Sequence, residues 1–161
     1  MATTAYTGKA TVRRSISVPG GDGTMIQNEF SWSDLNAAEA SEALQEFNKS
    51  TSCRIKTKIK LSHPTDAGLS LDGQQIFRYD MNYNQINGLF YSPEDRTSME
   101  VSADIIIDKT SVEVFVDDGA FSYAIEIKPL SGNNEGFKFF GRDIEVKELK
   151  FYLMRSIWGN N

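Results

Sequence analysis

The sequence has few of the residues from which most catalytic and metal sites are built. Its 161 residues include one cysteine, Cys53, and one histidine, His63. A single cysteine excludes an internal disulfide, and one cysteine with one histidine cannot furnish a transition-metal site. The two residues lie about one strand apart with no third group marked to orient them, which disfavours a Cys-His nucleophile. We expect Cys53 to be a small buried hydrophobe.

Long apolar runs and an excess of basic charge are also absent. No run approaches the roughly 20 apolar residues that span a bilayer, so we expect no membrane partner. The net charge of −5 argues against a nucleic-acid partner, because phosphate binding needs clustered Lys and Arg. The opening residues MATTAYTGK do not form a signal peptide pattern. The compartment stays open: the cytoplasm, or the extracellular or periplasmic space if this chain is a module of an exported protein.

Short strands separated by turns make up most of the sequence. The most regular stretch, 103–128, predicts three consecutive strands joined by two tight turns. In 111–116 and 121–127 apolar side chains recur at every second position, which is the period of a strand. Asp117-Asp118-Gly119 predicts the second turn, because glycine adopts the positive φ that a short hairpin loop needs.

The N-terminal part predicts a hairpin followed by a helix. Residues 9–18 and 24–30 are expected to pair around the turn cluster 19–23. Asn36 with Glu39 three residues later is a capping-box pattern, which predicts the start of a helix. The apolar face of this helix consists of Ala40, Ala43, Leu44 and Phe47.

The remaining strands define the expected fold class. Residues 54–61 predict a half-buried strand whose outer face is basic, and we interpret that face as solvated; its side chains are Arg54, Lys56, Lys58 and Lys60. Many short strands at near-regular spacing predict an all-β antiparallel β-sandwich with one short helix near the N-terminus. We expect a single domain over 1–161, in which the hairpin and helix of 1–50 pack on a core sandwich of 54–158.

Aromatic residues exceed what a core of Phe, Ile and Val needs. We interpret six of them as exposed rings that can stack on sugar faces, namely Trp32, Tyr79, Tyr83, Tyr91, Tyr152 and Trp158. Arg and carboxylate side chains beside such rings can bond hydroxyl groups. Strand alternation leaves an alternative, in which Tyr79 is a core residue. The ligand-binding candidates are Trp32, Arg78, Tyr79, Asp80, Tyr91 and Glu113.

Carboxylates are too numerous to single out a catalytic pair. Glycoside hydrolysis needs two that face a sugar across a cleft; the candidates are Asp80, Glu94, Glu100, Asp104, Glu113 and Glu126. Glu113 lies inside a strand, either as a partly buried acid or as part of a solvent face. No cofactor is expected. Oxygen atoms that could bind a structural calcium ion are available in Asp117, Asp118, Asn133, Asn134 and Glu135. The alternative for Asp117 and Asp118 is that they serve only to form the hairpin turn.

One segment carries a family resemblance. IIIDKTSVEVFVDDG resembles the strand motif Asp-x-Ser/Thr-Ser-Val-Glu-Val-Phe, ending in Asn/Asp-Asp-Gly, of the C-terminal β-sandwich of glycoside hydrolase family 32, the invertases, levanases and other fructan hydrolases. Asp108, 111–115, Asp118 and Gly119 match it. The ending LKFYLMRSIW is similar to the last strand of that domain. Residues 6–16 echo the segment that leaves the catalytic propeller, but Arg13-Arg14-Ser15 replaces the family's Pro-Arg-Glu.

The resemblance implies a concanavalin-A-like sandwich of the jelly-roll type and no catalysis by this chain. The family's catalytic residues lie in a five-bladed propeller, in Trp/Asn-Asp-Pro-Asn, Arg-Asp-Pro and Glu-Cys motifs. None of these motifs occurs in this sequence. We therefore expect a non-catalytic module of a fructan-processing hydrolase that binds β-fructosides such as levan, inulin or sucrose-type sugars.

Two alternatives remain. The module is purely structural and docks onto a catalytic β-propeller in the same or another chain, or mediates oligomerisation. In that case it should expose an apolar patch and self-associate when isolated. The third hypothesis is a free-standing enzyme with an unrecognised carboxylate pair.

Overall fold

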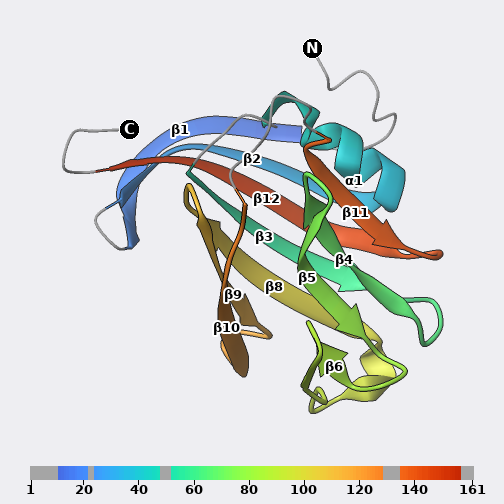
Figure 1. Cartoon of the computed structure of the whole chain (residues 1–161). Coiled ribbons are helices and arrows are strands. Elements are labelled where there is room, and N and C mark those ends of the chain that lie inside the picture. The colour runs from blue at the N-terminus through green and yellow to red at the C-terminus, as the bar shows by residue number, and fades with distance from the viewer. Residues whose placement is uncertain (1–10, 22–23, 48–51, 129–134, 157–161) are drawn as a thin grey trace.

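A computed structural model describes residues 11–21, 24–47, 52–128 and 135–156 of the chain. Two antiparallel sheets pack face to face in it (Figure 1). One sheet has seven strands in the order β1-β2-β12-β3-β8-β9-β10, and the other has five in the order β11-β4-β5-β6-β7. The predicted all-β sandwich with one short helix is confirmed.

The elements have the following bounds. The seven-stranded sheet contains β1 (Thr11–Gly21), β2 (Thr24–Asn36), β12 (Glu145–Ser156), β3 (Cys53–Lys60), β8 (Glu100–Ile107), β9 (Ser111–Val116) and β10 (Phe121–Glu126). The five-stranded sheet contains β11 (Phe137–Gly141), β4 (Asp66–Leu71), β5 (Gln74–Asp80), β6 (Gln85–Ile86) and β7 (Leu89–Phe90). The helix α1 (Ala37–Ala43) is accompanied by the 3-10 helices η2 (Gln45–Phe47) and η3 (Arg96–Ser98).

The last strand, β12, joins the N-terminal hairpin to the rest of the seven-stranded sheet. It pairs with β2 along one edge and with β3 along the other. Between Val146 and Glu148 the register with β3 shifts, so Lys147 is an extra residue in β12. The predicted hairpin is present as β1 and β2, and hydrogen bonds make it part of the same sheet as β3.

The predicted meander is confirmed as β8, β9 and β10. Ile105 lies opposite Val114, and Val114 lies opposite Tyr123. The turn between β9 and β10 has three successive residues with positive φ, at 49°, 59° and 91° for 117–119. Glycine at the third position relieves part of the strain that this conformation imposes on residues with a Cβ.

The helix α1 begins where the capping-box pattern predicts. The Glu39 backbone N–H donates to Asn36 Oδ1 at 2.8 Å, and the Asn36 N–H donates to Glu39 Oε1 at 2.9 Å. The predicted apolar face is buried, and the Phe139 N–H donates to Ser41 Oγ at 2.9 Å, which ties the helix to β11. No helix in the described ranges is long and apolar enough to cross a membrane.

The main apolar core of the described residues lies between the two sheets. Inward side chains from both sheets and from α1 join one buried cluster. Phe47 stacks on Phe151 of β12 with ring centroids 4.1 Å apart, which anchors the segment after α1 to the centre of the larger sheet. Cys53 belongs to this cluster, as expected, and burial raises the pKa of its thiol.

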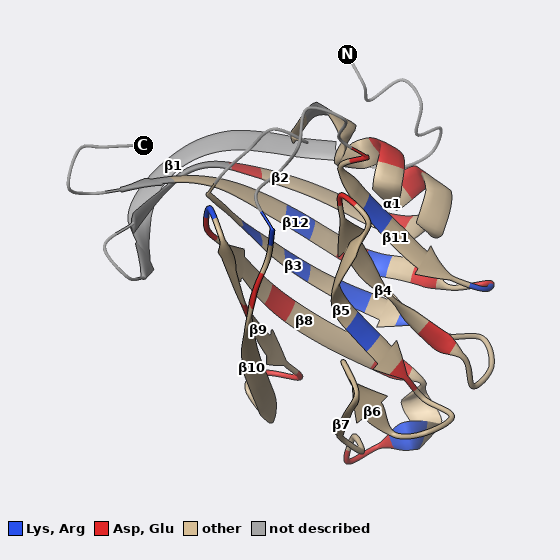
Figure 2. Cartoon of the chain, in the orientation of Figure 1, with Lys and Arg blue, Asp and Glu red and all other residues tan. Residues whose placement is uncertain are grey.

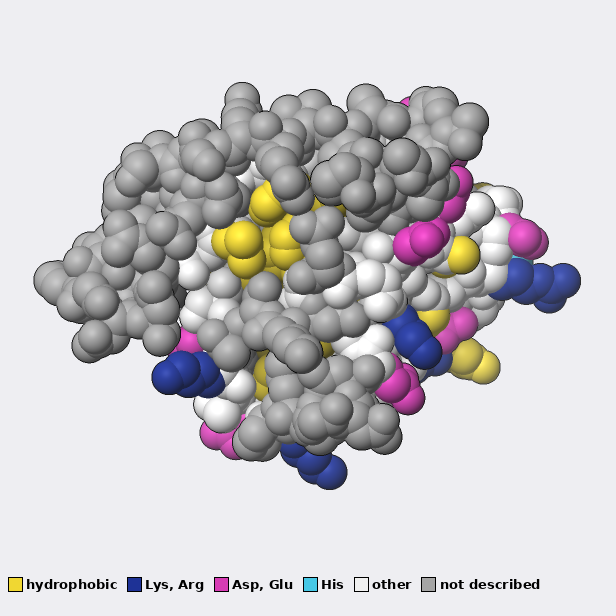
Figure 3. Space-filling view, turned by 90° about the horizontal axis from the view of Figure 1, so that it is seen from above, with side chains coloured by type: hydrophobic (Ala, Val, Ile, Leu, Met, Phe, Trp, Pro, Cys, Tyr) yellow, Lys and Arg dark blue, Asp and Glu magenta, His cyan; other side chains and the backbone are white. Residues whose placement is uncertain are grey.

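Seen from above, the side chains that can be described include hydrophobic ones near the middle of the view (Figure 3). Acidic and basic side chains lie toward the edge of the same view.

Gly68 lies where β4 and β5 approach too closely for any side chain. A Cβ at this position would lie 1.9 Å from the Phe77 carbonyl oxygen and 2.9 Å from Cζ of Phe140. The β4–β5 register shifts just beyond this point, between Leu69 and Ser70. The absence of a Cβ is therefore a condition for pairing these strands.

We predict that Gly68→Ala destabilises the fold by about 3 kcal/mol, because the clash involves backbone that cannot move without disrupting the sheet. Urea unfolding followed by circular dichroism measures the loss. Gly73→Ala is the matched control: its φ is +79° and the nearest atom to a Cβ is 4.0 Å away, so it should cost only about 1 kcal/mol of backbone strain. Equal losses in the two variants would contradict this account.

Candidate functional site

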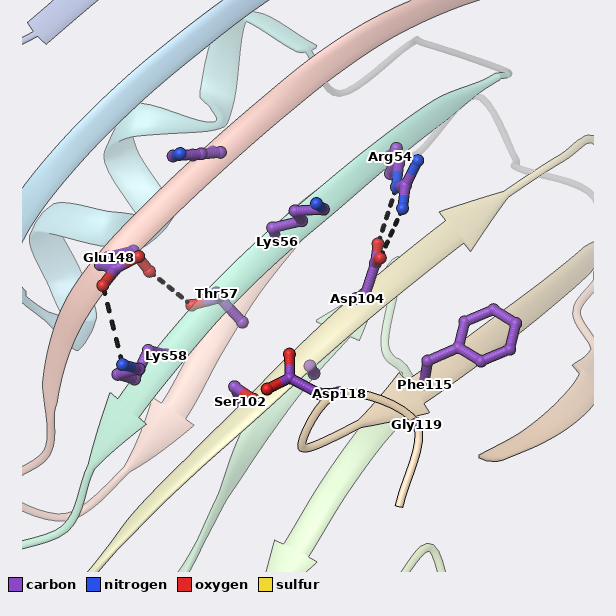
Figure 4. Close-up of a pocket in the computed structure, with 12 residues that line it drawn as sticks. Arg54, Lys56, Thr57, Lys58, Ser102, Asp104, Phe115, Asp118, Gly119 and Glu148 are labelled. Carbon is purple, nitrogen blue, oxygen red and sulfur yellow. Dashed lines mark hydrogen bonds and ion pairs between the residues drawn. The ribbon is translucent and has the colours of Figure 1, made fainter. Parts of the chain in front are cut away.

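A shallow groove of ≈ 670 Å³ crosses the outer face of the seven-stranded sheet (Figure 4). Outward side chains of four adjacent strands and the β9–β10 turn form it. The residues that line it are Arg54, Lys56, Thr57, Lys58, Ser102, Ala103, Asp104, Phe115, Asp118, Gly119, Glu148 and Lys150. The groove is therefore built on strands that pair directly with one another, β12 with β3, β3 with β8 and β8 with β9.

Strand alternation explains why these side chains face outward. In β3 the residues Cys53, Ile55 and Ile59 are buried in the core, so the residues between them point to the other face. The registers align one row of side chains across the sheet; from β12 to β9 it consists of Lys150, Lys56, Asp104 and Phe115. Figure 2 shows basic segments along β3 and an acidic segment beside them on β8.

Arg54 and Asp104 form a forked ion pair in the groove. Arg54 Nε donates to Asp104 Oδ1 at 2.8 Å, and Arg54 Nη2 donates to Asp104 Oδ2 at 2.6 Å. Both side chains are partly buried, and the hydrogen bond to Asp104 raises the pKa of the Arg54 guanidinium above its ordinary value. Each carboxylate oxygen of Asp104 thus accepts one hydrogen bond from Arg54.

The three lysines of the groove, Lys56, Lys58 and Lys150, differ in their partners. Lys58 Nζ lies 3.8 Å from Glu148 Oε2, a weak and exposed pair. The Thr57 hydroxyl donates to the Glu148 carbonyl at 3.0 Å. This bond joins β3 to β12 next to Lys147, the extra residue of β12. Among the described residues, Lys56 and Lys150 have no carboxylate within 4.0 Å.

Phe115 gives the groove an apolar surface at its β9 side. Its ring is 37% exposed. The turn beside it is held by Asp117, whose backbone N–H donates to the Ser102 carbonyl at 2.9 Å and whose carboxylate accepts from the Ser102 N–H at 2.9 Å. The Tyr91 hydroxyl donates to the other oxygen of Asp117. These bonds fix Asp118 and Gly119 at the rim of the groove.

A second hollow of ≈ 340 Å³ continues the groove past this turn. It shares Lys58, Ser102 and Asp118 with the first and extends toward 93–98. Its polar lining includes Glu94, Asp95 and Glu100. Within the described ranges, no group of three or more His, Cys, Asp or Glu side chains is placed to hold a metal ion. The calcium candidates Asn133 and Asn134 lie outside those ranges.

The structure separates the six residues that the sequence suggests as ligand contacts. Trp32 and Tyr79 are buried in the core, and Trp32 contacts Phe30 and Phe47 there with ring centroids 6.5 Å apart in each pair. The interpretation of these two rings as exposed is wrong, because strand alternation turns them inward. Tyr91 and Tyr152 are also buried. Tyr83 is exposed, and Trp158 lies outside the described ranges.

Arg78, Asp80 and Glu113 lie outside the groove lining, and Asp80 is buried. Arg78 and Asp80 are on the five-stranded sheet, where Arg78 bonds Asp66 at 3.1 Å and Asp80 at 3.4 Å. Asp80 also accepts from the backbone N–H groups of the following turn, at 3.0 and 3.3 Å. These bonds give Asp80 a structural role. Glu113 is half-buried on the outer face of β9, beside the groove but outside its lining.

Sequence reasoning misses most of the groove. It places Arg54, Lys56 and Lys58 on an outer face but interprets that face as merely solvated. The alternation of β9 also places Phe115 on the outer face with Glu113, so the two signals together could have indicated the site. The missing step is the pairing of β3 with β8, which brings Asp104 between them.

Tyr152 extends the polar network beyond Arg54. It lies opposite Arg54 on one side and Glu29 on the other. Burial raises the pKa of Tyr152 to about 12, and a hydrogen bond from its hydroxyl to the Glu29 carboxylate adds to the effect. Glu29, Tyr152, Arg54 and Asp104 therefore connect β2, β12, β3 and β8 across the outer face.

Comparisons with known proteins give matches only among solved structures. No protein-family model and no curated protein sequence matches the chain. The chain is similar to fructofuranosidase from Schwanniomyces occidentalis complexed with fructose, with a TM-score of 0.54 and 9% identity. It is also similar to exo-inulinase from Aspergillus awamori, with a TM-score of 0.55 and 14% identity, and to sucrose-6-phosphate hydrolase from Lactobacillus gasseri, with 0.51 and 12%.

The matches cover nearly all of this chain but a minority of each enzyme. They include 91%, 93% and 94% of this chain and 40%, 29% and 40% of the three enzymes in the same order. The chain thus spans less than half the length of each. At these identities the likeness establishes a shared fold, and it confirms the sandwich that the family resemblance implies.

We predict that Tyr152→Phe reduces the decrease in the free energy of unfolding at alkaline pH. Tyr152 titrates near 10 in the unfolded chain and near 12 in the fold, so its contribution is complete below pH 10 and is lost as the pH rises to 12. The variant should lose less free energy of unfolding over that window, by on the order of 2 kcal/mol. Urea unfolding at successive pH values measures it. Tyr83→Phe, which removes an exposed hydroxyl, is the control, and parallel curves for wild type and Tyr152→Phe would refute the prediction.

Proposed function

We propose that the chain is a non-catalytic β-sandwich module of a fructan-processing glycoside hydrolase, and that the outer-face groove binds β-fructosides. The observation that carries the proposal is the groove itself, in which the exposed Phe115 ring lies beside the hydrogen-bonding side chains of Arg54 and Asp104. The fold shared with part of a fructofuranosidase and an exo-inulinase supports the class of parent enzyme.

The groove has the size and chemistry of a sugar site. Ligand sites commonly enclose about 300–1,000 Å³, and the groove has ≈ 670 Å³. An aromatic ring packs on the apolar face of a sugar, while charged side chains bond its hydroxyls. Lys56 and Asp118 have polar groups directed to the groove. Because the lining residues lie on paired strands, little ordering is needed on binding.

The carboxylates of the groove suit binding better than hydrolysis. Glycoside hydrolysis requires one acid that holds a proton and a second carboxylate that is free to attack or to activate water. Asp104 is held by both nitrogens of the Arg54 fork, and Glu148 lies beside Lys58. Asp118 is the one lining carboxylate without a basic partner among the described residues, so it has no second free carboxylate in the groove to work with. The absence of the propeller motifs from the sequence supports the same reading.

We predict that levan or inulin binds the chain and that Phe115→Ala weakens this binding about tenfold, equivalent to about 1.4 kcal/mol. Isothermal titration calorimetry with levan, inulin and fructose measures the affinity. Phe90→Ala is the matched control, since it removes an equally large exposed ring from a different part of the surface. The control should bind as the wild type does.

Two results would contradict this proposal. No heat with any of the three sugars at millimolar concentration, or equal binding by wild type and Phe115→Ala, would remove the groove as a sugar site. Release of reducing sugar from levan by the chain alone, abolished by Glu113→Gln, would overturn its non-catalytic character.

A second candidate function is docking onto a catalytic domain through the segment 83–90. Four large hydrophobic side chains are exposed in the described part of the chain, and three of them lie in this segment: Tyr83 at 73%, Leu89 at 53% and Phe90 at 75%. Clustered exposed apolar side chains mark interaction sites. A catalytic domain of a fructan hydrolase is the occupant we infer, since most of each similar enzyme lies outside the shared fold.

The segment 83–90 is held rigidly enough to act as a docking surface. The Arg78 backbone N–H donates to Asn87 Oδ1 at 2.6 Å, and the Asn87 N–H donates to the Arg78 carbonyl at 2.8 Å. The Tyr91 N–H donates to the Asn84 carbonyl at 2.8 Å. These bonds fix the hairpin of β6 and β7 at one edge of the five-stranded sheet, with Ile86 in the core and Leu89 and Phe90 outward.

We predict that the isolated chain self-associates through this segment, and that the double variant Leu89→Ser, Phe90→Ser is monomeric. Apolar groups that lack their partner domain are covered by a second copy at high concentration. Sedimentation velocity from micromolar to millimolar concentration measures the association. Phe115→Ser is the control and should associate as the wild type does. A monomeric wild type at every concentration would argue against the docking role.

A further inference from the structure

We infer that the groove prefers a sugar that carries one phosphate or sulfate group, which binds between Lys56 and Lys150. This inference rests on the proposed sugar-binding function of the groove and names the class of ligand. Its basis is the pair of lysines at the centre of the outer face, the lack of a carboxylate partner for either among the described residues, and the position of Phe115 in the same row.

Lys56 and Lys150 lie directly opposite each other on β3 and β12. Both side chains line the groove. Residues opposed in this way have Cβ atoms about 5 Å apart, and like charges in that position destabilise a sheet. An anion that binds both ammonium groups would relieve this repulsion.

The carboxylates nearest to the two lysines are bound elsewhere. Asp104 lies opposite Lys56 in the register, but it is paired with Arg54, which donates to both of its oxygens, at 2.8 and 2.6 Å. On its other side Lys150 lies opposite Ser31, which carries no charge. The row therefore offers two ammonium groups without a counter-ion from the described residues, in a chain whose net charge is −5.

Lys147 on the same strand shows the opposite arrangement. Its Nζ lies 3.5 Å from Asp34 Oδ1 and 3.6 Å from Glu145 Oε2. These two carboxylates raise the pKa of the Lys147 ammonium. Two acids thus pair with Lys147 outside the groove, whereas Lys56 and Lys150 inside it have no acid partner among the described residues.

The geometry of the row indicates where the sugar would lie. Lys56 and Phe115 are separated by two strand spacings, about 10 Å in total. That distance fits an anionic group at the lysines and a sugar ring against Phe115. Glu148 and Asp118, which also line the groove, would repel a polyanion. The ligand that fits therefore carries a single anionic group rather than a charged polymer.

Titration with fructose and fructose 6-phosphate tests this inference, with calorimetry for affinity and amide chemical shifts for location. We expect fructose 6-phosphate to bind about tenfold more tightly than fructose, and the preference to fall as salt is added. The double variant Lys56→Gln, Lys150→Gln should bind fructose 6-phosphate no more tightly than it binds fructose. Lys60→Gln is the matched control, because it removes a lysine from the same face of β3 outside the groove lining. It should retain the preference.

The possible results separate this inference from the proposed function. If fructose and levan bind but fructose 6-phosphate binds no more tightly, the anion site is wrong and the sugar site stands. An unchanged preference in the double variant, or an equal loss in Lys60→Gln, would also overturn the anion site. If no sugar binds, both the proposed function and this inference fail.

Discussion

The strict alternation of side chains along β3 is the constraint on which the rest of the structure depends. Cys53, Ile55 and Ile59 must lie in the core, so Arg54 and Lys56 must face outward. A slip of one residue would bury the basic side chains and expose the apolar ones. Eight paired positions with β8 hold the register. The hydrophobic pattern that stabilises the sandwich thus also places the polar groups of the groove.

Local features of the fold could be predicted from sequence, because their signals lie within a few residues. The α1 capping box and the meander of β8, β9 and β10 are examples. The position of β12 between β2 and β3 could not, since it depends on pairing between distant segments. Alternation with Phe77 is enough to turn Tyr79 inward, but the burial of both Ile76 and Phe77 depends on the register shift between β4 and β5, which local alternation does not reveal.

The candidate site illustrates the same limit. The sequence gives each strand's outer face separately, so Lys56 and Phe115 are individually predictable as outward residues. Their common row, and the opposition of Lys56 to Lys150, exist only through the β3–β8, β8–β9 and β3–β12 registers. Aromatic residues mislead for a related reason: a ring such as Trp32 fits a core as well as a sugar, and burial decides between the two.

The two candidate surfaces are linked by one chain of hydrogen bonds, so binding and docking are compatible roles. Tyr91 directly follows β7, which carries the exposed Phe90, and its hydroxyl donates to Asp117. Asp117 in turn holds the backbone of Ser102 at the groove. The groove occupies the outer face of one sheet and the docking segment the edge of the other. A module docked through 83–90 would therefore keep its groove open. The bonds of Asp117 to Tyr91 and to Ser102 would hold the backbone in place at both surfaces.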